Sequence, residues 1–153
     1  MSWLEHKIPP PVIGVLCALL MWGISTQTPV IAWWGIAAQV ITAVLVAVGL
    51  FLDSGGLLSF IRSKTTINPV HIEKASALVT GGVYRFTRNP MYLGMALLLT
   101  ALAVWLQSPL AFIGPLLFVG YITRFQIIPE EKVLEGIFGQ DYLNYRQDTR
   151  RWF

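Results

Sequence analysis

Hydrophobic residues are concentrated in four long runs, which are separated by short polar stretches. The runs predict membrane-spanning helices at residues 9–28, 31–52 (with an optional extension to 62), 90–107 and 109–128. Their lengths are close to the roughly 20 apolar residues that a helix needs to cross the hydrocarbon core of a bilayer. Asp53 is expected to mark the point where the second run leaves the hydrocarbon. The pattern therefore predicts an all-α membrane protein with four transmembrane helices.

The chain becomes amphipathic after the fourth run. Within residues 129–148, the apolar residues Val133, Leu134 and Ile137 recur at helical spacing among charged residues. This spacing predicts short cytoplasmic helices that follow the spans. The sequence contains no internal repeat or low-complexity tract, so residues 1–153 are expected to form a single integral membrane domain.

Composition supports a membrane protein, and the placement of charge predicts its orientation. Only 12% of the residues are charged and 55% are hydrophobic, whereas soluble domains carry roughly a quarter charged residues. With four spans, every Lys and Arg falls on one side of the membrane, which the positive-inside rule makes the cytoplasmic side. We therefore expect an integral protein of the inner or cytoplasmic membrane with both termini in the cytoplasm. The eleven cations are Lys7, Arg62, Lys64, Lys74, Arg85, Arg88, Arg124, Lys132, Arg146, Arg150 and Arg151.

Several classes of function lack support in the sequence. Cys17 is the single cysteine, and His6 and His71 lie far apart, so neither an internal disulfide nor a metal site is expected. There is no G-x-G-x-x-G fingerprint, P-loop or G-x-S-x-G elbow. No ionisable residue lies in the middle of a predicted span, which argues against an ion channel or a proton relay. No nucleic-acid partner is expected, and the sequence leaves the oligomeric state open.

Two polar clusters border the third and fourth runs. The first, Gly81–Gly94, reads GGVYRFTRNPMYLG and places Arg88 and Asn89 directly before Pro90, where the third helix begins. The free N–H groups and positive dipole of a helix start suit a carboxylate or phosphate, although arginines beside a span also serve as simple anchors. The second cluster, Pro129–Glu131, supplies carboxylates that either cap a helix or bind hydroxyl or ammonium groups. We expect both clusters to meet at one membrane face and form a single site.

The two clusters lie within longer segments that resemble a known family. Leu78–Gly94 and Pro129–Phe153 resemble the isoprenylcysteine carboxyl methyltransferase and phospholipid methyltransferase group of integral membrane enzymes. Its pattern is Y-R-x-x-R-[HN]-P-x-Y-x-G followed, after a pair of hydrophobic spans, by E-E-x-x-L-x-x-x-F-G-x-x-Y-x-x-Y. The residues that fill the pattern here are Tyr84, Arg85, Arg88, Asn89, Pro90, Tyr92 and Gly94, then Glu130, Glu131, Leu134, Phe138, Gly139, Tyr142 and Tyr145.

The resemblance implies a methyltransferase that binds S-adenosylmethionine at the cytoplasmic face. The acceptor would be a lipid-like or other apolar small molecule that approaches from the bilayer. Arg85 and Arg146, or alternatively Arg150, are candidates for holding an anionic acceptor. Members of the group often carry histidine where this chain has Asn89, and asparagine cannot titrate, which argues against a general base at that position. By position, the residues implied to bind the donor are Tyr84, Arg88, Asn89, Pro90, Tyr92, Leu93, Gly94, Glu130 and Glu131.

Two other functions compete with the methyltransferase interpretation. A non-catalytic membrane protein can bind lipid headgroups or a partner through the same basic loop, and such binding would depend on salt and anionic lipid. A nicotinamide-dependent reductase is a weaker alternative, because sterol reductases resemble this group in their C-terminal spans but have more spans than this chain holds.

Overall fold

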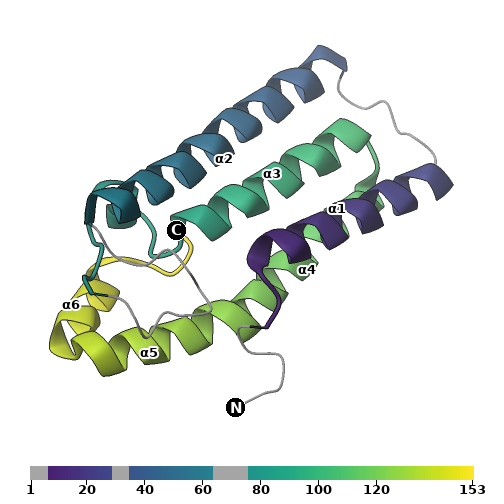
Figure 1. Cartoon of the computed structure of the whole chain (residues 1–153). Coiled ribbons are helices and arrows are strands. Elements are labelled where there is room, and N and C mark those ends of the chain that lie inside the picture. Colours follow the sequence, from purple (N-terminus) through teal and green to yellow (C-terminus); the bar gives the residue numbers. More distant parts are fainter. Residues whose placement is uncertain (1–6, 29–34, 64–75) are drawn as a thin grey trace.

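A computed structural model describes residues 7–28, 35–63 and 76–153, and this part of the chain is helical without any strand (Figure 1). The predicted all-α class is therefore confirmed. The start of the second predicted span (residues 31–34) and much of the polar loop that follows it (residues 64–75) lie outside the described residues. The elements are α1 (Pro10–Gln27), α2 (Gly35–Ser63), η2 (Gly82–Arg85), α3 (Pro90–Leu106), η3 (Pro109–Phe112), α4 (Ile113–Ile122), η4 (Thr123–Ile127), α5 (Ile128–Phe138) and α6 (Gln140–Asp148).

Three helical stretches in the described chain are long and apolar enough to cross a membrane. They are Pro10–Gln27, Gly35–Ser63 and Pro109–Phe138, whereas the third predicted span corresponds to the shorter apolar helix Pro90–Leu106. That helix has 17 residues because both of its ends are set locally. Proline occupies its first turn, and Gln107 adopts a left-handed conformation with φ of 50° that ends it. The structure thus shows three candidate spans and one shorter apolar helix beside them.

Helix α2 continues well past the predicted exit at Asp53 and ends at Ser63, in agreement with the optional extension. The extension contacts the start of α3 through Gly56, while Leu57, Leu58 and Ile61 are exposed. A Cβ atom built on Gly56 would lie 2.6 Å from Cγ of Met91, and one built on Gly49 would lie 3.0 Å from the carbonyl oxygen of Gly94. Small residues therefore allow α2 and α3 to approach closely, as they do in other membrane helix pairs.

The short helices predicted at residues 129–148 correspond to α5 and α6, but no break separates α5 from the helix before it. Instead α4, η4 and α5 form one uninterrupted helical run from Ile113 to Phe138, whose direction changes between α4 and α5 (Figure 1). Pro129 lacks an N–H and would disturb an ordinary α-helix. The π-helical segment η4 accommodates it, because the N–H of Ile128 reaches back to the carbonyl oxygen of Thr123 in a wider turn.

Helix α3 is the centre of the helix arrangement. It packs against α2 on one side and against α1 and α4 on the other (Figure 1). Met21, Ala103, Phe118 and Ile122 are fully buried where α1, α3 and α4 meet. Helix α2 instead exposes large apolar side chains along most of its length, as expected for a surface that faces lipid.

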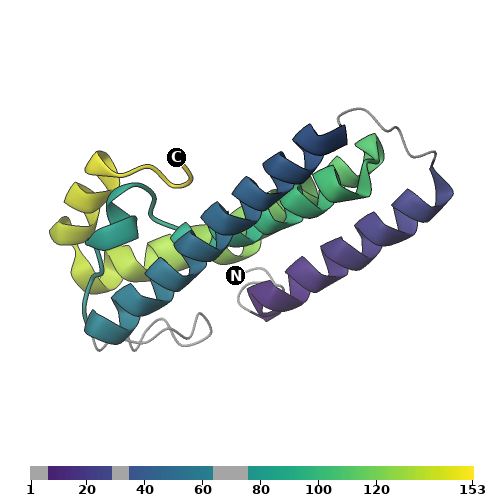
Figure 2. The ribbon, with the colours of Figure 1, turned by 90° about the horizontal axis from the view of Figure 1, so that it is seen from above.

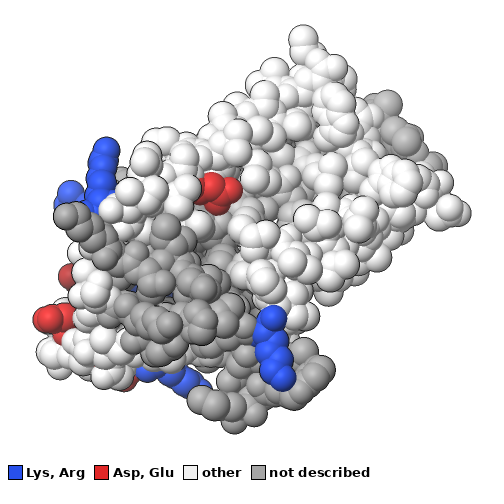
Figure 3. All heavy atoms as spheres, viewed as in Figure 1, with Lys and Arg blue, Asp and Glu red and all other residues white. Residues whose placement is uncertain are grey.

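The polar elements gather at one end of the bundle. Viewed from above, α5, α6 and η2 lie together at the same end of the bundle (Figure 2). On the face in Figure 3, the described Lys and Arg side chains also lie toward this end, and the described part of the opposite end carries none. The sequence agrees, since it has no Lys or Arg between Lys7 and Arg62 or between Arg88 and Arg124.

Candidate functional site

The start of α3 and the start of α5 carry the two polar clusters, and the structure brings them into direct contact. The residue before a proline is disfavoured in the helical conformation, and Asn89 accordingly has φ of −132° and ψ of 56° just before Pro90 opens α3. The Arg88 guanidinium donates to Glu131 at 2.8 Å, and the Tyr92 hydroxyl donates to Glu130 at 2.7 Å. The predicted meeting of the two clusters is therefore observed.

Glu131 is held between two arginines. Arg88 Nη2 donates to its Oε1 atom at 2.8 Å, while Arg151 donates to both oxygens, with Nε to Oε1 at 2.9 Å and Nη2 to Oε2 at 2.7 Å. The side chains of Arg88 and Glu131 are only 8% and 10% exposed, whereas that of Arg151 is 33% exposed. Two guanidinium groups favour the ionised form of Glu131, and the carboxylate in turn raises the pKa of Arg151.

Arg88 also holds the chain near residues 146–150. Its Nη1 atom donates to the carbonyl oxygens of Arg146, at 3.2 Å, and Thr149, and its backbone N–H donates to the carbonyl of Arg150 at 2.9 Å. Its Nε atom is buried without a hydrogen-bond partner among the residues that the structure describes. Arg88 is thus enclosed by the fold, unlike an arginine that only anchors a helix at the membrane surface.

Glu130 lies in a separate buried network. Its Oε1 atom accepts hydrogen bonds from the Tyr92 hydroxyl at 2.7 Å and from Gln126 Nε2 at 2.6 Å. Gln126 belongs to η4 and is 3% exposed. Sequence reasoning missed it, although a lone amide four residues before Glu130 in an apolar run was a usable signal, because that spacing places two side chains on the same helix face.

Asn89 and Thr87 bind the chain beyond α6. The Nδ2 atom of Asn89 and the Oγ1 atom of Thr87 both donate to the carbonyl oxygen of Arg151, at 3.0 and 3.1 Å. Thr87 is 1% exposed and was not singled out in the sequence. Asn89 acts here as a hydrogen-bond donor, consistent with the expectation that it is not a titrating base.

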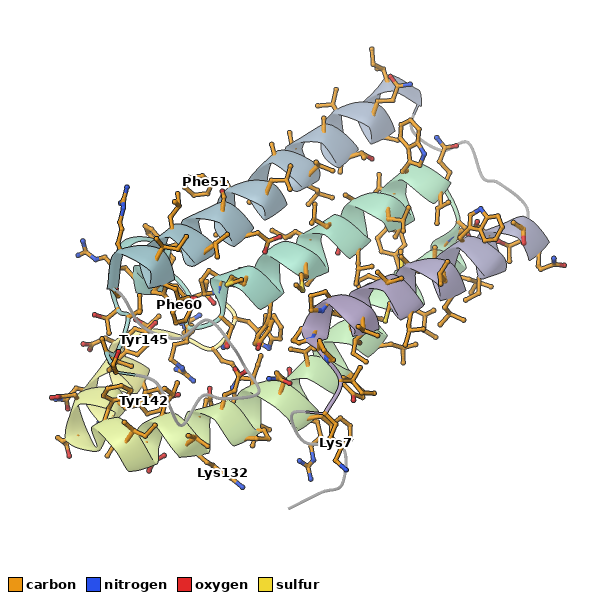
Figure 4. The ribbon with its side chains drawn as sticks, in the orientation of Figure 1. Lys7, Phe51, Phe60, Lys132, Tyr142 and Tyr145 are labelled. Carbon is orange, nitrogen blue, oxygen red and sulfur yellow. The ribbon has the colours of Figure 1, made fainter. Side chains whose placement is uncertain are left out.

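Aromatic residues line the side of the site nearest α6. The ring of Tyr84 contacts Phe60 of α2 edge-on with 5.6 Å between ring centroids, and its carbonyl accepts a hydrogen bond from the Tyr145 hydroxyl at 2.8 Å. Figure 4 shows Tyr142 and Tyr145 on α6, on the side that faces the rest of the site. Burial raises the pKa of Tyr84 well above its ordinary value, with Tyr145 and Glu130 adding to the effect, so its hydroxyl stays protonated.

The remaining predicted site residues lie at the edges of this arrangement. Gly94 packs against α2, where an added Cβ atom would lie 2.8 Å from the carbonyl oxygen of Gly49. Leu93 is half-buried one residue earlier on α3. Arg85 is exposed at the end of η2, and the exposed side chain of Arg146 forms a 3.5 Å ion pair with Glu135. Neither arginine side chain is drawn into the buried networks around Glu130 and Glu131.

Comparisons with known proteins show which family this chain resembles. A family model described as phospholipid methyltransferase matches residues 37–141. Protein-S-isoprenylcysteine O-methyltransferase A of Arabidopsis thaliana is 30% identical over 120 residues, which cover 76% of this chain and 58% of that protein. A probable protein-S-isoprenylcysteine O-methyltransferase of Oryza sativa subsp. indica is 31% identical over 104 residues, covering 68% of this chain and 54% of that protein.

A bacterial relative is more similar over a shorter stretch. A Haemophilus influenzae protein, named only as uncharacterized, is 45% identical over 62 residues, which cover 40% of this chain and 98% of that protein. The chain spans somewhat more than half the length of the plant methyltransferases that it matches. These matches confirm the resemblance inferred from the two motifs. Since the family model covers more than half of its residues, this chain belongs to the phospholipid methyltransferase family.

Proposed function

We propose that this protein transfers a methyl group from S-adenosylmethionine to a lipid-like or other apolar small molecule at the cytoplasmic face of a membrane. The observation that carries the proposal is the buried contact of Arg88 and Tyr92 with Glu131 and Glu130 at the basic end of the bundle. The family membership supports it, and the two plant relatives carry the name of isoprenylcysteine methyltransferases. The comparisons give no support to a headgroup-binding protein or to a reductase.

The side chains of the site fit the parts of the donor. A methionine carboxylate needs buried cationic or N–H donors, and Arg88 has a buried Nε atom that no described residue satisfies. Ribose hydroxyls and an ammonium group need carboxylates, which Glu130 and Glu131 supply. A sulfonium is stabilised by aromatic faces, and Tyr92 lies beside the acidic pair. Asn89, Pro90, Tyr84, Leu93 and Gly94 complete the proposed donor-binding set around them.

When bound, the donor supplies an electrophilic methyl group for an in-line displacement. The contribution of the protein is then chiefly alignment, which can lower a barrier by several kcal/mol. A general base is unnecessary if the acceptor arrives as an anion such as a carboxylate or thiolate, and Asn89 could not act as one. In this scheme Arg85 and Arg146, both exposed at the same end of the bundle, attract the anionic group of the acceptor.

We infer a topology with four crossing segments, which includes α3, and with the basic end in the cytoplasm. A helix of 17 residues is about 26 Å long, slightly less than the ~30 Å hydrocarbon thickness. Helix α3 contacts α1, α2 and α4, so neighbouring helices cover much of its surface. The distribution of Lys and Arg then obeys the positive-inside rule for every loop.

Calorimetry on the detergent-solubilised full chain tests the donor proposal. Wild type should bind S-adenosylmethionine, and Arg88→Ala or Glu131→Ala should weaken that binding at least about tenfold, because each removes a charge-assisted contact. Lys132→Gln serves as a matched control, since Lys132 is exposed beside Glu131 and points away from the bundle in Figure 4. Binding of anionic lipid or reduced nicotinamide without any binding of the donor would contradict the proposal.

Labelled donor can then identify the acceptor class. Incubating the enzyme and labelled S-adenosylmethionine with membrane lipid extracts should transfer label to an apolar product. Parallel reactions with small prenylated cysteine compounds test the substrate that the plant relatives' names indicate. If the label stays in the aqueous phase with both acceptor sets, the proposal of an apolar acceptor is wrong.

A further inference from the structure

Residues Thr149–Trp152, here called the 149–152 segment, lie between the start of α3 and the start of α5. Their backbone carbonyls accept hydrogen bonds from Thr87, Arg88 and Asn89, and the Trp152 indole donates to Thr123 of η4 at 3.3 Å. Part of the indole also packs against the hydrophobic core. The segment is therefore bound at both ends, and its position is coupled to both polar clusters.

Arg151 is the side chain of this segment that contacts the acidic pair. It approaches Glu131 side-on through two different nitrogens, at 2.9 and 2.7 Å, and so engages both carboxylate oxygens. Arg88 reaches only the Oε1 atom. A two-pronged guanidinium–carboxylate contact defines the plane of the carboxylate, whereas a single hydrogen bond leaves it free to rotate.

Burial separates the roles of the two arginines. The Arg88 side chain is 8% exposed and lies inside the site, while the Arg151 side chain is 33% exposed and lies at its rim. Arg88 already balances the charge of Glu131, so the second cation is not needed for neutrality. What Arg151 adds is the orientation of the Glu131 carboxylate. The backbone of Arg151 is itself held in place, because Asn89 and Thr87 donate to its carbonyl oxygen.

We propose that Arg151 is a positioning residue for donor binding, which acts through Glu131 by holding its carboxylate in the plane that the donor requires. This inference rests on the proposed function. In this arrangement the 149–152 segment completes the donor site. Thr87 and Asn89 fix the backbone of the segment, and Arg151 orients the Glu131 carboxylate.

A double-mutant cycle on the full chain in detergent tests the inference, with binding of S-adenosylhomocysteine and S-adenosylmethionine measured by calorimetry. Arg151→Gln should weaken binding about tenfold or more. The same change in a Glu131→Gln background should add less than about twofold, because the residue through which Arg151 acts is already altered. In a Tyr92→Phe background, which changes only the Glu130 network, Arg151→Gln should keep its full effect.

Further variants separate positioning from charge and from folding. Arg151→Lys retains the cation but cannot form the two-pronged contact, so its binding should remain several-fold weaker than wild type. If Arg151→Gln does not fold, donor binding by Arg151→Lys relative to wild type still tests the inference. Lys132→Gln removes a nearby exposed charge and should bind like wild type.

Three outcomes would overturn the inference. If Arg151→Lys binds the donor as tightly as wild type, Arg151 contributes only its charge. If Arg151→Gln weakens donor binding equally in the Glu131→Gln and Tyr92→Phe backgrounds, its effect does not pass through Glu131 and its role is structural. If Arg151→Gln binds the donor as tightly as wild type, Arg151 has no role in donor binding. Each of these requires that wild type binds the donor. If wild type binds neither ligand, the proposed function itself fails, and the two failures are thereby distinguishable.

Discussion

Glu130 and Glu131 are adjacent in the sequence, yet their partners differ in kind. Glu131 accepts hydrogen bonds from two arginines, whereas Glu130 accepts them from a tyrosine hydroxyl and a glutamine amide. Among the described residues, both hydrogen-bond donors to Glu130 are neutral, so a cationic group of the proposed donor would complement its carboxylate. The separation of the two networks is a property of individual side chains and makes each network testable on its own.

Gln126 offers a test of the Glu130 network. Gln126→Leu keeps the approximate volume but leaves Glu130 with one hydrogen-bond donor fewer in a buried place, and the free energy of unfolding should fall by about 1–3 kcal/mol. Gln140 is a matched control, since it also donates to a residue four positions later, Asn144, but on an exposed surface. Gln140→Leu should change stability by less than about 0.5 kcal/mol. Chemical denaturation in detergent measures both, and equal effects would contradict the assignment.

The raised pKa of Tyr142 predicts how the stability of the folded state changes at alkaline pH. Burial raises the pKa of Tyr142 from 10.0 to about 12, so the folded state disfavours the tyrosinate. Because the folded-state pKa lies above the unfolded value, the stabilisation is complete below pH 10 and is lost as the pH rises from about 10 to about 12. The thermal midpoint should therefore fall over this range, and Tyr142→Phe should make the fall shallower. Identical slopes for the two proteins would show that Tyr142 does not contribute.

At the scale of helices, glycine decides how closely α2 and α3 approach. The carbonyl oxygen of Gly49 lies 2.8 Å from the position of a Cβ on Gly94, and backbone cannot move aside as a flexible side chain can. Packing against α2 therefore already requires glycine at position 94, and the helix crossing brings this position to the edge of the proposed donor site. The π-helical segment η4 has a comparable effect, because it keeps α4 and α5 continuous through Pro129 and aims Glu130 and Glu131 at α3.

Gly94→Ala is expected to destabilise the protein by about 1–3 kcal/mol, since it overpacks the crossing of α2 and α3. Gly120→Ala is the control, because a Cβ on this helical glycine meets nothing within 4 Å. Alanine is a better helix former than glycine, so Gly120→Ala should be neutral or stabilising by up to about 1 kcal/mol. Thermal unfolding in detergent compares the two variants. A loss of stability in Gly120→Ala as large as in Gly94→Ala would show that packing at the crossing is not the cause.

At the scale of the whole molecule, the described Lys and Arg side chains on the face in Figure 3 lie toward one end of the bundle. The buried contacts of Glu130 and Glu131 lie at the same end. A membrane provides the solvent that such a shape requires, since the exposed surface of α2 is lined by large apolar side chains. With the topology proposed above, the site would lie near the water interface, where the proposed soluble donor and apolar acceptor would reach it from different sides.

Cysteine labelling can test the proposed topology with its four crossings. In a Cys17→Ser background, Arg85→Cys and Lys132→Cys should react with a membrane-impermeant thiol reagent from the same side, and Leu110→Cys from the opposite side. All three native side chains are exposed in the structure, and Leu110 closely follows the polar Gln107–Ser108 turn, where the proposed topology has the chain at the membrane surface. Inside-out and right-side-out vesicles distinguish the two sides. Labelling of residues 85 and 110 from one side would mean that α3 does not cross.

Much of this protein follows from local sequence. The apolar runs, Pro90 at a helix start and the segregation of Lys and Arg determined where helices form and which end is polar, because run length, proline and charge act over a few residues. The motifs around Arg88 and Glu131 indicated both clusters and their family.

Other features depend on contacts between distant parts of the chain, and only the tertiary structure decided them. Thr87 and Arg151 are 64 residues apart and meet through one backbone carbonyl, and the guanidinium of Arg151 completes the contacts of Glu131. The close approach of Gly94 to α2 and the burial of Gln126 likewise depend on which helices pack together. Helix spacing predicts which residues share a face, but the partner of that face is set by packing among helices, which no local pattern encodes.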